Sequence, residues 1–172
     1  KTPSLNLRIM FKINHKKILF NLAFILILFF IDRTTKIYIL KLAELNNVVD
    51  IYLSPYLNLY LIWNQGVAFG LISFDDQIIY NLITFIISSI IIFLIILAAK
   101  TEGIRRYFYI LIIGGALGNF FDRIYYSAVP DFIDLHIGEF HWFVFNIADI
   151  FITIGVTCLI TAEMIIDTKV KK

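Results

Sequence analysis

The segment formed by residues 78–99 carries no charged side chain and consists almost wholly of apolar residues. About 20 such residues in a helix cross the hydrocarbon core of a bilayer. Hydrophobic residues make up 60% of the 172-residue chain and charged residues only 16%, against about 25% charged in soluble domains. We therefore predict an all-α membrane protein in which residues 1–172 form one domain. The expected transmembrane spans are 18–40, 78–99, 105–125 and 145–166.

The basic residues indicate how these spans are oriented. Lys and Arg gather in residues 1–17, in the 100–106 loop and in residues 169–172, whereas the two other loops are mainly acidic. Basic residues mark the cytoplasmic side of a membrane. Both termini are thus expected in the cytoplasm, with 1–17 as a basic N-terminal segment. No small-residue cleavage site follows the first span, so we expect it to stay uncleaved.

The outer loops contain signs of a small β element. Residues 57–63, LNLYLIW, partly alternate and are rich in residues that favour strands. The aromatic loop 126–144 could supply another strand or two. The net charge of +2 is not gathered into a patch suited to nucleic acid. The single Cys158 falls in the last span, so no intrachain disulfide is possible.

Three carboxylates are predicted at a similar depth near the outer surface. Asp32 lies about 21 Å along the first span from its inner end, at about 1.5 Å per residue. Asp122 closes the third span and Asp149 begins the fourth. The last two follow an Asn by three residues, in NFFD and NIAD, and so share a helix face with it. The preceding GGALG has the small-residue spacing that allows helices to approach closely.

Most of these polar residues have an ordinary structural interpretation. Asp32 and Lys36 are spaced as an ion pair within a helix, and Asp122 with Arg123 could serve a helix end. Asp75 and Asp76 are expected to be solvated or to cap the second span. The stretch HIGEFH (136–141) has neither zincin spacing, so no metal is expected there. Asp149 differs, because it has no opposite charge nearby in sequence and acids inside membranes are functional by default.

Two carboxylates in one site would share a single proton, as in an aspartic protease. The ionised acid could deprotonate water while the protonated acid polarises a carbonyl. The residues leave the partner of Asp149 open among Asp122, Asp131 and Asp134. Neither a G-x-S-x-G nor an H-E-x-x-H motif occurs, which argues against a serine or zinc protease.

Five blocks of sequence, in order, resemble those of the bacterial lipoprotein signal peptidases, also called type II signal peptidases. The blocks are DRTTK (32–36), NQGVAFG (64–70), GGALGNFFDRI (114–124), VPDF (129–132) and FNIADIFITIG (145–155). The resemblance covers nearly the whole chain. It implies an intramembrane aspartic endopeptidase of the bacterial inner membrane that removes signal peptides from diacylglyceryl-modified prolipoproteins at the outer face.

The resemblance also implies roles for individual residues. It selects Asp131 and Asp149 as the catalytic pair. Residues expected to bind substrate or support the pair are Asp32, Lys36, Asn64, Gly66, Ala68, Phe69, Gly70, Asn119, Asp122, Arg123, Asn146 and Ala148. The segment 64–70 is expected to cover the cleft. Pro130 departs from the aliphatic residue common in the family. No metal or cofactor is implied, the protein is expected to be a monomer, and the inhibitor globomycin should bind the same cleft.

Two rival interpretations remain at this stage. A small transporter or proton-relay subunit would also place acids inside the membrane. A purely structural scaffold would need only that Asp149 be hydrogen-bonded and inert.

Overall fold

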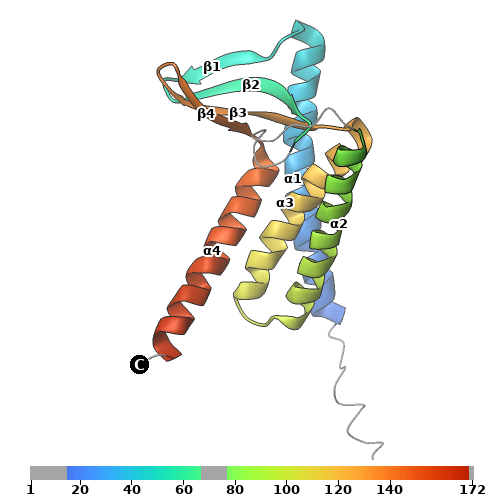
Figure 1. Cartoon of the computed structure of the whole chain (residues 1–172), viewed down its shortest axis with the longest axis vertical. Coiled ribbons are helices and arrows are strands. Elements are labelled where there is room, and N and C mark those ends of the chain that lie inside the picture. The colour runs from blue at the N-terminus through green and yellow to red at the C-terminus, as the bar shows by residue number, and fades with distance from the viewer. Residues whose placement is uncertain (1–14, 67–76, 171–172) are drawn as a thin grey trace, which may run out of the picture.

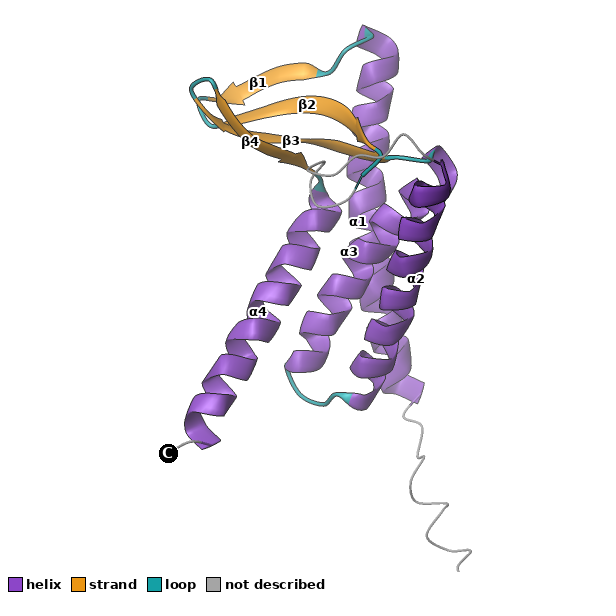
Figure 2. Cartoon of the chain, viewed as in Figure 1, coloured by secondary structure: helices purple, strands orange, loops and turns teal. Residues whose placement is uncertain are grey.

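The computed structural model describes residues 15–66 and 77–170 of the chain. A bundle of helices carries a small antiparallel sheet at one end (Figures 1 and 2). In chain order the elements are α1 (His15–Asn46), β1 (Asp50–Ser54), β2 (Leu57–Asn64), α2 (Gln77–Lys100), α3 (Arg105–Tyr126), β3 (Val129–Ile137), β4 (Phe140–Phe145) and α4 (Ile147–Val170). The expected β element on residues 57–63 is confirmed as β2, and the 126–144 loop supplies β3 and β4.

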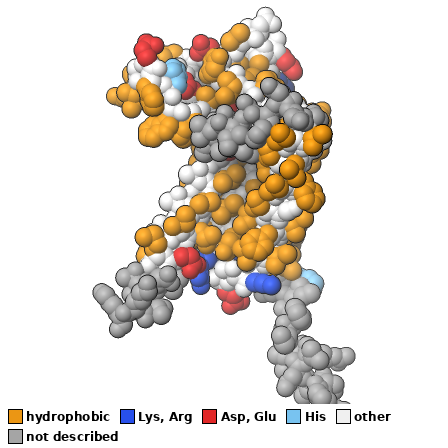
Figure 3. Space-filling model, in the orientation of Figure 1, with side chains coloured by type: hydrophobic (Ala, Val, Ile, Leu, Met, Phe, Trp, Pro, Cys, Tyr) orange, Lys and Arg blue, Asp and Glu red, His pale blue; other side chains and the backbone are white. Residues whose placement is uncertain are grey.

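Three of the helices are long and apolar enough to cross a membrane, namely α1, α2 and the Ile147–Ile165 part of α4. The predicted third span corresponds to α3, which has glycines in its middle and charged residues at both ends. These residues lower its apolar content. Hydrophobic side chains cover the visible helix surface below the sheet, and charged side chains appear at the far end of the bundle (Figure 3).

Helix α1 is longer than the predicted span 18–40. Its 32 residues extend about 48 Å at 1.5 Å per residue, well beyond a hydrocarbon core of about 30 Å. The upper part therefore continues past the bundle to the level of the sheet (Figure 1). Asn47 follows with a φ of 62°, the left-handed conformation that commonly ends a helix.

Helix α3 occupies the centre of the bundle and contacts α1, α2 and α4. Its glycines explain how closely α1 approaches. A Cβ placed on Gly114 would lie 2.7 Å from Leu28, and one on Gly118 would overlap the carboxylate of Asp32. Leu28 and Asp32 are themselves four residues apart, so one turn of α1 fits against one turn of α3. This contact brings the polar residues of the two helices together.

The sheet has the order β1-β2-β3-β4. Ile39 near the top of α1, Val49 and Phe132 of β3 form a small buried cluster that fixes the sheet to the bundle. Strand β4 ends at Phe145 and α4 starts at Ile147, two residues later than the predicted span 145–166. A single connecting residue, Asn146, therefore joins the sheet to the last helix.

Candidate active site

Asn146 and Asp149 form a reciprocal cap at the start of α4. The Asn146 side-chain oxygen accepts a hydrogen bond of 3.2 Å from the backbone N–H of Asp149. The Asp149 carboxylate in turn accepts one of 3.1 Å from the backbone N–H of Asn146. This is the capping-box arrangement with Asn and Asp in place of Ser and Glu. The NIAD sequence thus places a carboxylate at the N-terminal end of α4, where the helix dipole favours negative charge.

Asp131 lies on β3, directly above this helix start. Asn146 donates a hydrogen bond of 2.6 Å to one Asp131 oxygen, and Asn64 at the end of β2 donates one of 2.8 Å to the other. The pairing of Asn64 with Val129 fixes the register of β2 against β3 at this point. Asn146 therefore contacts both acids, through its side chain to Asp131 and its backbone to Asp149.

The two acids line one cavity of about 230 Å³. Its other lining residues are Asn64, Asn119, Arg123, Val129 and Ile152. Burial raises the pKa of Asp131 to about 7, and the nearby Asp149 carboxylate adds to the rise. Hydrogen bonds from Asn64 and Asn146 oppose it. Asp131 is therefore poised to exchange a proton near neutral pH.

A fully buried ammonium group lies beneath the cavity. Lys36 donates three hydrogen bonds, of 2.9 Å to Asp32, 2.7 Å to Asp122 and 2.8 Å to the side-chain oxygen of Asn119. An ammonium has three protons, so all its donors are satisfied. Arg33 lies 2.6 Å from the second oxygen of Asp122. These two acids and two bases form a buried group with no net charge.

Asn119 links this buried group to the cavity. Because Lys36 holds the oxygen of the Asn119 amide, the amide nitrogen faces Asp149 and donates a hydrogen bond of 2.8 Å to it. Asp32 also contacts α4, the helix that carries Asp149, by accepting a hydrogen bond of 3.0 Å from the backbone N–H of Ala148. The spacing from Asn119 to Asp122 thus presents both side chains to Lys36, as their common helix face predicts.

Arg123 connects α3 with the end of β2. Its guanidinium donates a hydrogen bond of 2.7 Å to the carbonyl of Gly66. The backbone N–H of Gly66 donates in turn to the side-chain oxygen of Asn64, at 2.9 Å. Tyr80 of α2 supports Arg123 by donating to its carbonyl, at 3.1 Å. Asn64 and Gly66 are thereby fixed at the edge of the cavity.

Five of the predicted site residues line this one cavity, namely Asn64, Asn119, Arg123, Asp131 and Asp149. Asp122 contacts Lys36 and Arg33 below the cavity, while Asp134 lies 2.8 Å from His141 on the sheet. Of the three candidate acids, Asp131 lines the cavity with Asp149. Ala68, Phe69 and Gly70, like Asp75 and Asp76, lie outside the described residues, as does most of the predicted cover 64–70.

Sequence reasoning did not identify Arg33 or Tyr80 as part of this arrangement. Arg33 follows Asp32 directly, so a second cation beside an intramembrane acid was a usable signal. Its guanidinium also lies 5.0 Å from the ring centroid of Phe121. Tyr80 gave no signal, because only the packing of α2 against α3 brings its hydroxyl to Arg123.

The apolar helices define the class as a membrane protein, and the two carboxylates share a polar cavity where the last helix meets the sheet. Comparison with known proteins agrees. Residues 24–165 match the family model described as signal peptidase (SPase) II. The chain is 61% identical over 158 residues to the lipoprotein signal peptidase of Pelagibacter ubique (strain HTCC1062), covering 92% of this chain and 95% of that one.

More distant relatives show the same relationship. The lipoprotein signal peptidase of Anaplasma phagocytophilum (strain HZ) is 40% identical over 136 residues, which cover 78% of this chain and 85% of that protein. A solved bacterial membrane enzyme matches with a TM-score of 0.71 at 31% identity, covering 88% of this chain and 91% of that one. The chain belongs to the signal peptidase II family. It is therefore a membrane protease of bacterial lipoprotein processing.

Proposed function

We propose that the chain is an aspartic endopeptidase that cuts diacylglyceryl-modified prolipoproteins before the lipidated cysteine, with Asp131 and Asp149 as its catalytic pair. The observation that carries this proposal is that both carboxylates line one cavity and that all four of their oxygens accept hydrogen bonds from amide groups. Among the described residues neither acid forms an ion pair. Asp32 and Asp122, in contrast, are neutralised by cations and suit a structural role.

Charge balance supports one shared proton. Arg123 lines the same cavity and interacts electrostatically with both Asp131 and Asp149. One ionised and one protonated carboxyl beside one guanidinium give no net charge, whereas two carboxylates would leave an unbalanced buried charge. The proton belongs to the pair rather than to either acid.

The reaction follows from this protonation state. The ionised acid takes a proton from a water held in the cavity, and the water oxygen attacks the scissile carbonyl carbon. The protonated acid donates its proton to the carbonyl oxygen, giving a tetrahedral intermediate. When the carbon–nitrogen bond breaks, the acid that took the water proton gives it to the amide nitrogen, which leaves as the amine. The other acid takes a proton from a hydroxyl group of the intermediate, so the new carbonyl forms and the pair again holds one proton. Asn119 and Asn146 hold the two carboxyl groups in place throughout.

An apolar groove beside the pair suits a lipid-linked substrate. The groove, about 320 Å³ in volume, includes Asp149 and runs along the first turns of α4 beneath the sheet. Its apolar lining consists of Leu135, Phe143, Phe145, Ile150 and Ile154. We propose that it receives the apolar part of the substrate next to the scissile bond. Globomycin-type inhibitors would compete for the same space.

The proposal includes a placement in the bacterial inner membrane. Helix α3 would also cross the membrane and bring the number of spans to four, since it packs between three helices that are themselves long and apolar enough to cross. The termini would lie in the cytoplasm and the sheet, with the catalytic pair, at the outer face. Residues 1–172 would act as one domain and as a monomer.

The test uses purified protein in detergent with a diacylglyceryl-modified prolipoprotein, and follows signal-peptide release by gel shift. Asp131→Asn and Asp149→Asn should each lose cleavage by a factor of about 10² or more, because Asn cannot transfer the proton. Asp50→Asn, an exposed change on β1 of the same sheet, is the matched control and should cut normally. Thermal unfolding verifies that each variant is folded.

Retained cleavage in folded Asp131→Asn would make another acid the partner. If wild type cut nothing and Asp149→Asn abolished proton movement across vesicles instead, the relay alternative would replace the peptidase.

A further inference from the structure

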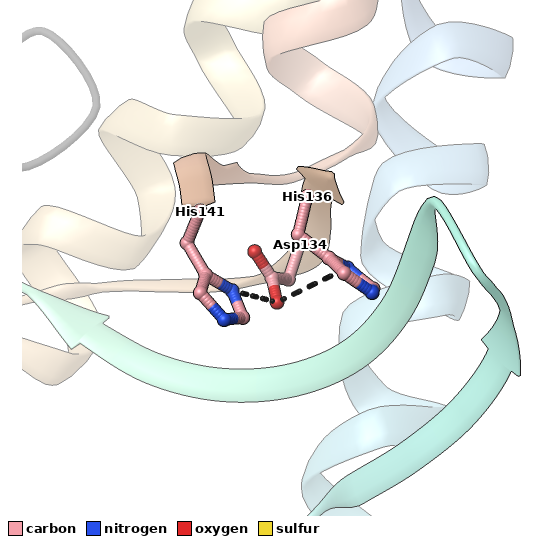
Figure 4. Close-up of side chains that lie close together, drawn as sticks. All are labelled: Asp134, His136 and His141. Carbon is pink, nitrogen blue, oxygen red and sulfur yellow. Dashed lines mark hydrogen bonds and ion pairs between the residues drawn. The ribbon is translucent and has the colours of Figure 1, made fainter. Parts of the chain in front are cut away.

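A second cluster of ionisable side chains lies on the sheet, separate from the proposed catalytic pair. Asp134 and His136 of β3 and His141 of β4 place one potential ligand atom each within 4.8 Å of one another. Figure 4 shows both imidazole rings turned toward the same carboxylate oxygen. Asp131 is three positions from Asp134 on β3, so alternation along the strand directs the two carboxylates to opposite faces of the sheet.

A β-bulge creates this cluster. Leu135 pairs with Phe143, but the next residue of β3, His136, pairs with His141 instead of Trp142. The extra residue on β4 shifts the alternation by one, which moves His141 onto the face of Asp134 and His136. Without the bulge His141 would point to the other face. Bulges commonly reorient a side chain at functional sites.

The cluster contains buried polar atoms that the described residues leave without hydrogen-bond partners. These are Nδ1 of His136, Oδ1 of Asp134 and Oδ1 of Asn58. The His136 side chain is only 9% exposed, and its Nδ1 lies 3.8 Å from Asp134 Oδ2, too far for a hydrogen bond. Asn58 stands directly opposite Asp134 in the register of β2 with β3. Such atoms are rarely left unsatisfied in native proteins.

A divalent transition metal would give the unpartnered Nδ1 of His136 a partner, and the geometry points to a zinc site formed by Asp134, His136 and His141. Tetrahedral zinc with ligand bonds of about 2.1 Å separates its ligand atoms by about 3.4 Å. Oδ2 of Asp134 lies 2.8 Å from His141 Nδ1 and 3.8 Å from His136 Nδ1, on either side of that value. Two imidazoles and a carboxylate are ligands suited to Zn²⁺.

A water would complete the four-coordinate zinc. The site joins the two strands of the β3–β4 hairpin. That hairpin carries Asp131 and leads directly into Asn146, so zinc stabilises the part of the sheet that positions the cavity. The site lies on the opposite face of the sheet from the proposed catalytic pair, so the metal would take no part in the reaction at that pair. The proposed site takes its acid from Asp134 and not from Glu139 of the HIGEFH stretch.

The first test titrates Zn²⁺ against the full chain, purified in detergent without a polyhistidine tag, using a chromophoric chelator as competitor. One equivalent should bind, and the unfolding temperature should rise with zinc concentration. His136→Gln and His141→Gln should each weaken zinc binding at least about tenfold. Mutating a residue that only supports a metal ligand already costs about that much affinity, and losing a ligand should cost no less. Two controls, Glu139→Gln at the neighbouring acid and His15→Gln at the remaining histidine, should bind zinc with the affinity of wild type.

A second measurement needs no variant. Zinc should protect His136 and His141 from carbethoxylation by diethyl pyrocarbonate, followed by mass spectrometry, while His15 on α1 reacts equally with and without the metal. Absence of zinc binding to wild type, equal loss in the Glu139→Gln control, or protection of His15 alone would overturn the assignment. Water would then be what satisfies the buried atoms.

Discussion

The raised pKa of Asp131 makes the stability of the protein depend on pH in a direction opposite to that of most acids. The pKa is about 7, against an ordinary 3.8. The folded protein therefore binds this proton more tightly than the unfolded chain does. Between pH 4 and 7 the folded state holds more protons, so the free energy of unfolding falls as pH rises. The stabilisation is complete below about pH 4 and is lost as pH rises through about 7.

The size of the effect follows from the same pKa. At 1.36 kcal/mol per pKa unit the full difference corresponds to about 4 kcal/mol, of which about 2.3 kcal/mol falls between pH 5 and 7, because the group is already half deprotonated at pH 7. Burial makes the largest contribution, followed by repulsion from Asp149 on α4. Lys36 on α1 opposes the rise, and Arg123 on α3 is also within electrostatic range of Asp131.

The assay is thermal unfolding in detergent at pH 5, 6 and 7, with wild type beside Asp131→Asn and the exposed Asp50→Asn. At about 2–4 °C per kcal/mol, wild type and Asp50→Asn should lose about 5–9 °C between pH 5 and 7. Asp131→Asn should lose markedly less, because Asn does not titrate. If Asp131→Asn kept the full wild-type slope, or if wild type became more stable as pH rose, the account of a buried acid that holds its proton would be refuted.

Three further substitutions test the packing that supports the cavity. Lys36→Met leaves two buried carboxylates short of a cation and should lower the free energy of unfolding by about 3–5 kcal/mol. The control Lys41→Met, exposed on the same helix, should change it by no more than about 0.5 kcal/mol. Equal melting temperatures for the two variants would contradict this. Gly115→Ala would push a methyl group into the carbonyl of Ala148 and should cost about 1–3 kcal/mol, an expectation that unchanged melting would refute. Asn119→Ala removes a hydrogen-bond donor to Asp149 of the proposed catalytic pair and should lower cleavage about tenfold to a hundredfold at unchanged substrate concentration. Full activity would remove Asn119 from the proposed mechanism.

Local sequence determined the elements that carry the site. The apolar stretch 78–99 could form only a buried or membrane-spanning helix, and α2 covers it. Asn146 and Asp149 are spaced for a helix cap, and the structure forms that cap. The Asp32–Lys36 ion pair, four residues apart on one helix, was likewise predicted from spacing alone. Such features depend on residues within one helical turn, so no distant contact is needed to foresee them.

Tertiary structure decided which acids share a cavity. Apart from the family resemblance, sequence left Asp122, Asp131 and Asp134 equivalent as partners of Asp149. The register of β2 against β3 turns Asp131 toward Asn64 and Asn146. The packing of α1 on α3 places Asp122 within hydrogen-bonding distance of Lys36. Contacts between residues so far apart in sequence leave no mark in local spacing. The bulge on β4 that brings His141 beside Asp134 is likewise fixed by strand pairing, because shifting the register by one residue changes the face on which a side chain lies.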